Sequence, residues 1–149
     1  MSGKSRVCGL LAKGAKPYTI SMKRLWIHYN PNPKRRRTID CAVRAVAGAL
    51  GLDWDTAWMM IAAKSFDGKG MSVENANWGA ILRRFGFKRA AIPNTCPDCY
   101  TAADFIRDHP RGTFVLGFDD HTAVVIAGGI YDTWDSTGEI PQYYWYREA

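Results

Sequence analysis

The feature that most constrains the fold is a change in the spacing of apolar residues along the chain. Up to about residue 110, apolar side chains recur mainly at helical spacing. Beyond it, short β-branched and aromatic runs separated by turn residues predict four strands, at 113–118, 121–127, 130–135 and 142–146. Helices followed by antiparallel strands are typical of an α+β fold, and 149 residues suffice for one such domain.

The first helical segment, residues 38–50, carries small or apolar residues on nearly all sides and is expected to be buried. Thr38 or Asp40 is suited to its N-cap, and Gly51 ends it. Three further helices are expected over residues 54–62, 72–85 and 102–108, with Asp53, Ser72 and Thr101 at their starts.

The domain is expected to span residues 22–149, preceded by an extension of uncertain order over residues 1–21, which is rich in Gly, Ser and Lys. No apolar run approaches the ~20 residues of a membrane span. The four cysteines are too few and too unevenly placed for a disulfide scaffold. These features predict a protein of a reducing, cytoplasmic compartment without a membrane segment.

The net charge of +6 comes from 20 Lys and Arg against 14 Asp and Glu. The positive charge is concentrated in two blocks, residues 34–37 and residues 83–89. The sequence contains no zinc-finger spacing, RNP motif or KH loop, so nucleic acid is not the expected partner. We interpret the blocks as solvated basic surface that suits an acidic protein or peptide.

Cys41 lies at the start of the buried helix, where the helix dipole and free backbone N–H groups favour a thiolate. The same N–H groups can stabilise an oxyanion formed when the sulfur attacks a carbonyl. Such chemistry needs a base and a group that orients it. His121 begins one predicted strand, and Asp132 and Asp135 lie on the next.

The hairpin between these two strands decides which aspartate neighbours His121. A two-residue turn at Gly128–Gly129 places His121 opposite Ser136, whereas a three-residue loop over residues 127–129 places it opposite Asp135. The three-residue loop with glycine in the left-handed conformation is a common hairpin. It therefore predicts Asp135 as the partner of His121, with Asp132 on the other face.

The pair Cys96 and Cys99 has the spacing of zinc or redox motifs. Structural zinc needs four ligands, and the sequence has no second cysteine pair and only His109 nearby. A redox motif normally opens a helix after a strand, which is not predicted here. We expect structural thiols in a loop, no metal and no cofactor.

A cysteine at the start of a helix, followed by a histidine and an aspartate on successive strands, resembles the papain-like cysteine peptidase superfamily. Four segments are similar to an uncharacterised group of small phage and prophage proteins; they are Tyr29–Pro33, Asp40–Ala45, Pro93–Tyr100 and Tyr131–Ser136. The resemblance covers Met22 to the C-terminus. It implies a papain-like fold in which the N-terminal helices pack on the C-terminal antiparallel sheet.

The resemblance also implies a cysteine peptidase in which Cys41 is the nucleophile, His121 the base and acid, and Asp135 the orienting group. The implied substrate is a host or phage protein met in the host cytoplasm. Papain-like enzymes usually carry an oxyanion-hole glutamine six residues before the cysteine, where this sequence has Arg35. Asn32, Asn30 or Arg35 itself is the expected substitute, and Trp134 is expected to shield the His–Asp pair.

Two other functions remain open at the level of sequence. The same triad supports amidase or transglutaminase-like acyl transfer to an acceptor other than water. A papain-like domain without activity would act as a binding or inhibitor protein. Selective reactivity of Cys41 distinguishes an enzyme from such a protein.

Overall fold

The computed structural model describes residues 24–148, so the expected extension over residues 1–21, including Cys8, lies outside the described residues. The helices are α2 (Cys41–Leu50), α3 (Trp54–Asp67), α4 (Asn75–Arg84) and α5 (Ala102–Asp108). The strands are β1 (Trp26–His28), β2 (Lys88–Ala91), β3 (Thr113–Gly117), β4 (Thr122–Ile126), β5 (Gly129–Asp132) and β6 (Tyr143–Tyr146). This confirms the α+β class. Within residues 24–148, no helix has the length and apolar character needed to cross a membrane.

The strands form one six-stranded sheet in the order β1-β5-β4-β3-β6-β2. The predicted antiparallel sheet is mixed instead, because β1 pairs in parallel with β5 at one edge. At the other edge β2 pairs with β6. Both edge strands were missed from sequence because they are only three and four residues long and are mostly exposed. Such short segments have no clear alternation of apolar and polar residues.

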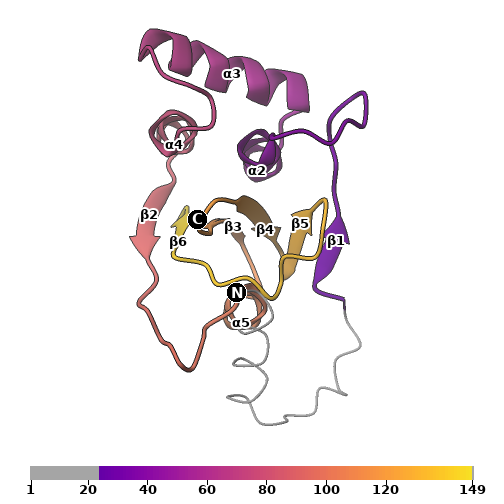
Figure 1. The fold of residues 1–149 in the computed structure, drawn as a ribbon, viewed down its shortest axis with the longest axis vertical. Helices are drawn as coiled ribbons and strands as arrows, with labels where there is room; N and C mark the ends of the chain where they lie inside the picture. Colours follow the sequence, from indigo (N-terminus) through magenta and orange to yellow (C-terminus); the bar gives the residue numbers. More distant parts are fainter. Residues whose placement is uncertain (1–23, 149) are drawn as a thin grey trace.

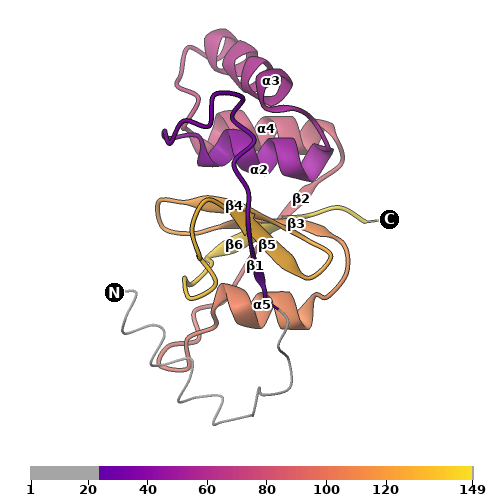
Figure 2. The same cartoon turned by 90° about the vertical axis from the view of Figure 1, so that its right-hand side faces the viewer.

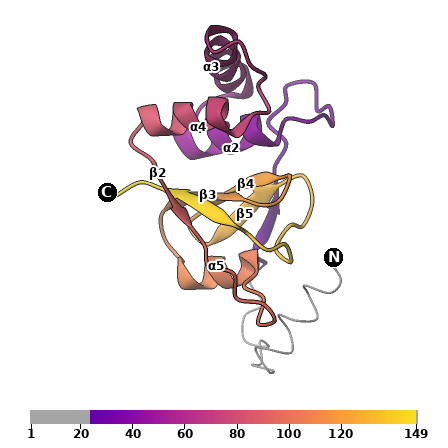
Figure 3. The same cartoon turned by 60° about the vertical axis from the view of Figure 1, so that its left-hand side comes forward.

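Helices cover both faces of this sheet (Figures 1 and 2). α2 and α4 lie on one face with α3 stacked outside them, and α5 lies alone on the opposite face. Figure 3 shows β2 and β6 running between α4 and α5. Two apolar cores result: Val46, Ile81 and Trp145 belong to the first, and Phe105 and Leu116 to the second. Apolar burial on both faces stabilises the sheet that carries the site.

The seating of α2 on the sheet depends on a glycine in the helix. A Cβ atom at Gly48 would lie 2.7 Å from Cγ1 of Val124 on β4, so only glycine permits this close approach. Gly51 then ends the helix in the left-handed conformation, with φ of 67°. This packing fixes the N-terminal end of α2, and with it Cys41, relative to the start of β4.

Candidate active site

Cys41 is the first residue of α2 and is partly buried. Asp40 holds the N-cap position, as predicted, but its side chain does not cap the helix. Thr122, the first residue of β4, donates a backbone hydrogen bond to the sulfur, and His121 makes a side-chain hydrogen bond with it. The structure therefore brings Cys41 and His121 together, as the sequence predicted.

His121 follows a tight turn, in which Phe118 N–H donates to the carbonyl of His121 at 2.8 Å. Two aromatic side chains contact its ring. The centroid of Trp134 is 5.0 Å from the imidazole, and that of Phe118 is 5.8 Å from it. Trp134 thus lies where the shielding prediction placed it. These contacts restrict the orientation of the ring and exclude water from part of it.

The carboxylate that orients His121 belongs to Asp132. His121 Nε2 donates to Asp132 Oδ2 at 2.6 Å, and Ser136 Oγ donates to the same oxygen at 2.8 Å. The other oxygen accepts from Thr133 N–H at 2.8 Å and from Arg44 Nη2 at 3.1 Å. Asp132 is 1% exposed, so this buried carboxylate is fully satisfied by its partners.

The prediction that Asp135 neighbours His121 was wrong. Asp135 is exposed, and its Oδ1 accepts hydrogen bonds from the hydroxyl and the backbone N–H of Thr137 at 2.6 and 3.1 Å. It orders the local turn and makes no hydrogen bond to His121.

The error lies in the hairpin register. The observed turn is Ala127–Gly128, with Ile126 opposite Gly129 and Val124 opposite Tyr131. Extended to the strand ends, this register places Trp134 opposite His121 and Asp132 diagonal to it on the same side. A one-residue shift exchanges the faces of a strand. Ala127 adopts φ of 48°, which non-glycine residues rarely do, so no residue pattern predicts this turn.

Arg44 links the start of α2 to the end of β5. Its guanidinium forms ion pairs with Asp40 through Nη1 and with Asp132 through Nη2. Asp40 also accepts from Trp54 Nε1 at 2.9 Å. All three charged groups are buried, at 4%, 6% and 1% exposure for Asp40, Arg44 and Asp132. The link ties together the two elements that carry Cys41 and Asp132, and sequence analysis had missed it.

These contacts set the protonation of the site. Burial alone would raise the pKa of the Cys41 thiol, but the hydrogen bond and charge of His121, the Thr122 N–H and Arg44 together lower it. Burial would lower the pKa of His121, but Asp132 and Cys41 raise it to about 9. Burial would raise the pKa of Asp132, yet its hydrogen bonds and the His121 charge lower it. The site therefore favours a thiolate, an imidazolium and a carboxylate.

Cys41 and His121 open into a cleft of about 230 Å³. Its walls are the start of α2, the segment leading into α4, the β3–β4 turn and Tyr143.

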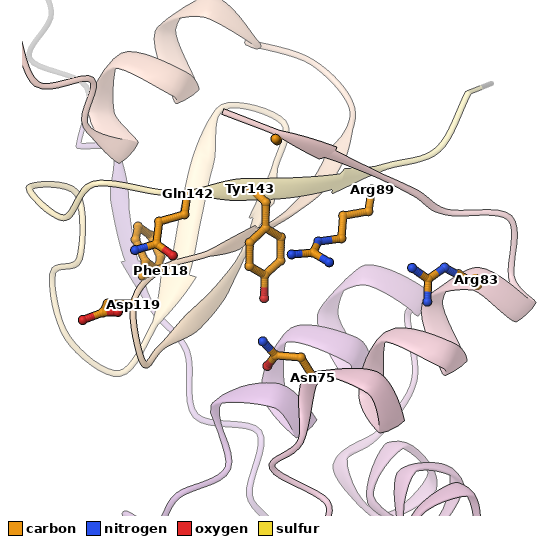
Figure 4. Close-up of a pocket in the computed structure, with 8 residues that line it drawn as sticks. Asn75, Arg83, Arg89, Phe118, Asp119, Gln142 and Tyr143 are labelled. Carbon is orange, nitrogen blue, oxygen red and sulfur yellow. The ribbon is translucent and has the colours of Figure 1, made fainter. Parts of the chain in front are cut away.

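Two side chains in this cleft can donate hydrogen bonds. Asn75 Oδ1 accepts from Trp78 Nε1 at 3.1 Å, which leaves the Asn75 amide N–H groups as donors. Burial raises the pKa of Tyr143 most, and Cys41 raises it further while Arg89 lowers it, so its hydroxyl stays protonated. Figure 4 shows this hydroxyl and the Asn75 side chain facing one another.

The three residues expected to form an oxyanion hole do not line this cleft. Asn32 is buried in its loop, where its Oδ1 accepts from Lys34 N–H at 2.8 Å. Asn30 donates to the carbonyl of Arg36 at 3.4 Å and accepts from Asn32 N–H. Arg35 is exposed, with a left-handed φ of 55°. The side-chain hydrogen bonds of Asn30 and Asn32 organise the loop, so the donors near Cys41 are other groups.

Cys96 and Cys99 lie in an irregular loop, as predicted, with their sulfur atoms 3.3 Å apart and not joined in a disulfide. His109 stacks on Phe105 and its Nδ1 lies 2.9 Å from the Phe105 carbonyl oxygen. In the described part of the chain, no group of three or more His, Cys, Asp or Glu side chains is arranged to hold a metal ion.

Comparison with protein-family models, curated proteins and solved structures finds no match to this chain.

Proposed function

We propose that the protein is a cysteine hydrolase of papain-like fold that cleaves a peptide or isopeptide bond in a protein substrate. The observation that carries the proposal is the chain of hydrogen bonds from Cys41 through His121 to Asp132, with the sulfur at a helix N-terminus. A buried carboxylate, an imidazole and a thiol in this order are the components of nucleophilic catalysis.

In the proposed reaction the Cys41 thiolate attacks the carbonyl carbon and forms a C–S bond. His121, as imidazolium, gives its proton to the departing amine nitrogen as the C–N bond breaks, which leaves a thioester on Cys41. The neutral His121 then takes a proton from water, whose oxygen attacks the thioester. The acid is released and the thiolate–imidazolium pair is restored. Asp132 orients the ring and stabilises its charge throughout.

The negative oxygen of the tetrahedral intermediate needs hydrogen-bond donors. We assign this role to the backbone N–H groups at the start of α2, supported by the Asn75 amide and the Tyr143 hydroxyl, because these donors line the same cleft as Cys41. This assignment replaces the glutamine of the papain pattern with donors from α4 and β6.

The resemblance of the segments around Cys41 and Asp132 to phage proteins supports a phage-encoded enzyme that acts on a host or phage protein in the host cytoplasm. Amidase or transglutaminase-like acyl transfer uses the same thioester and differs only in the acceptor. An inactive binding or inhibitor protein would have no use for a lowered thiol pKa at Cys41.

The test is the rate of alkylation of each cysteine by iodoacetamide at pH 6.5, followed by peptide mass spectrometry. An ordinary thiol with a pKa near 8.5 is about 1% ionised at this pH. We expect Cys41 to react at least about tenfold faster than Cys96, and to lose this advantage in His121→Ala. Equal rates at the two thiols would contradict the proposal.

A second measurement distinguishes hydrolysis from acyl transfer. The protein is incubated with a peptide and hydroxylamine, and the masses of the peptide products show whether water or hydroxylamine was the acceptor.

A further inference from the structure

A second and larger hollow adjoins the Cys41 cleft. It has a volume of about 600 Å³, and Asn75, Phe118, Asp119 and Tyr143 line both spaces. A substrate chain bound at Cys41 can therefore extend past Tyr143 into this groove. The groove is defined by α4, β2, the β3–β4 turn and the start of β6 (Figure 4).

Two arginines from different elements of the fold line the groove. Arg83 comes from the end of α4 and Arg89 from β2, and Figure 4 shows both guanidinium groups directed into the same space. Each is held against an aromatic ring. The Arg89 guanidinium carbon lies 4.1 Å from the Tyr143 ring centroid, and that of Arg83 lies 4.9 Å from the Trp145 ring centroid. Stacking restricts both side chains before any ligand binds.

In residues 24–148, neither Arg83 nor Arg89 forms an ion pair or a side-chain hydrogen bond. The nearby Arg147 differs, because it donates to the carbonyl of Phe85 at 3.1 Å. Two like charges facing one space repel each other, and an anion between them relieves that repulsion.

The position of Tyr143 connects the groove to the chemistry. A Cβ atom at Gly117 would lie 2.1 Å from the Tyr143 ring, so glycine at this position lets the ring lie directly on β3. On one face of the molecule, Tyr143 thus lies between the Cys41 cleft and the two guanidinium groups. Asp119 lies at the end of the groove away from Arg83, so the groove is positive at one end and negative at the other (Figure 4).

We propose that Arg83 and Arg89 form a subsite for a carboxylate of the substrate, an Asp or Glu side chain or a chain-terminal carboxylate close to the scissile bond. The inference rests on the proposed function, because it defines the subsite relative to the bond that Cys41 attacks. Guanidinium groups bind carboxylates by paired, charge-assisted hydrogen bonds. Asp119 at the far end repels an acidic group and so helps to fix the direction in which the chain lies.

The test uses alkylating probes that carry the carboxylate themselves. Iodoacetyl-Glu-amide and iodoacetyl-Gln-amide are compared, each also with one or two glycines inserted after the iodoacetyl group to vary the reach. The Cys41 thiolate displaces iodide and forms a thioether, and the second-order rate constant is measured by intact mass. The variants are Arg83→Gln/Arg89→Gln and the control Arg84→Gln/Lys88→Gln, which removes the same charge from neighbouring exposed positions outside the groove.

We expect the Glu probe of the best length to react with Cys41 about tenfold faster than its Gln partner, corresponding to one charge-assisted contact. The preference should disappear in Arg83→Gln/Arg89→Gln, persist in the control pair and weaken at 0.5 M salt. Fast Cys41 alkylation with equal rates for both probes, or a preference that both double variants retain, overturns the subsite and leaves the proposed function standing. Reaction of Cys41 no faster than Cys96 overturns both.

Discussion

Cys41 and the pair Cys96–Cys99 show how differently one chain can treat the same side chain. Cys41 has an imidazole, a backbone N–H and a guanidinium charge acting on it, whereas the Cys96 sulfur lies 3.3 Å from that of Cys99 in an exposed loop. The lowered pKa of Cys41 comes from residues that are distant in sequence. The lowered pKa is therefore a property of the assembled fold, and it should be lost as the contacts of Cys41 are removed one at a time.

The largest effect is expected from Arg44→Ala. It leaves Asp40 and Asp132 as buried carboxylates without their shared cation, which costs about 3–5 kcal/mol of unfolding free energy. It also removes one cause of the lowered Cys41 pKa, so alkylation of Cys41 at pH 6.5 should become slower. Urea denaturation measures the stability. Arg84→Ala, at an exposed position, should stay within about 0.5 kcal/mol of the wild type, and an equal loss there would contradict the interpretation.

Next in size is the loss of the group that orients His121. Asp132→Ala should lower kcat/KM, or the rate of Cys41 acylation by an activated ester, about 10²–10³-fold. Asp135→Ala should change it less than about twofold, because Asp135 bonds only its own turn. If the two variants were equally impaired, the assignment of Asp132 would be untenable.

The variant Asp132→Asn separates the effect of the negative charge of Asp132 from that of its side-chain shape. In the proposed reaction, the imidazolium that protonates the leaving amine is present below the His121 pKa of about 9 and is lost as the pH rises through it. Asp132→Asn keeps the side-chain shape but removes the negative charge, so the pKa of His121 should fall. The alkaline limit of the pH–rate profile should therefore move to lower pH. An unchanged alkaline limit would show that His121 is not the acid.

The smallest effect is expected at the other thiols. Cys96→Ser/Cys99→Ser removes no group that contacts Cys41, His121 or Asp132, so Cys41 alkylation at pH 6.5 should stay within about twofold of the wild-type rate. Quantitative mass spectrometry of the Cys41 peptide measures this. A tenfold change in the rate would mean that the Cys96–Cys99 loop influences the reactivity of Cys41, which would contradict this expectation.

Sequence analysis predicted those parts of the fold that depend on local patterns. The buried helix that begins near Cys41, the short helix after Thr101 and the strand that follows His121 all have strong periodicity or caps, and they were found. α4 begins at Asn75 rather than near Ser72, since helix ends depend on local contacts. The edge strands β1 and β2 were missed because short exposed segments are defined by their neighbours rather than by their own pattern.

The site was predicted to the extent that order along the chain determines it. Cys41, His121 and Trp134 came together as expected. The identity of the aspartate that bonds His121, however, depended on one turn. Ala127 in the left-handed region shifted the register by one residue and exchanged Asp135 for Asp132. The roles of three residues were missed because no local sequence pattern indicates them; they are Arg44, Asn75 and Tyr143. Their roles arise from contacts across the fold, such as the Arg44–Asp132 ion pair between residues 88 positions apart.

The ion pairs of Arg44 also have a consequence for the order in which the site is assembled. Asp40, Cys41 and Arg44 leave the ribosome long before His121 and Asp132. Until those residues are synthesised and the sheet closes, Cys41 lacks its base and Arg44 has one carboxylate partner instead of two. The contacts that lower the pKa of Cys41 are therefore complete only once β4 and β5 have joined the sheet.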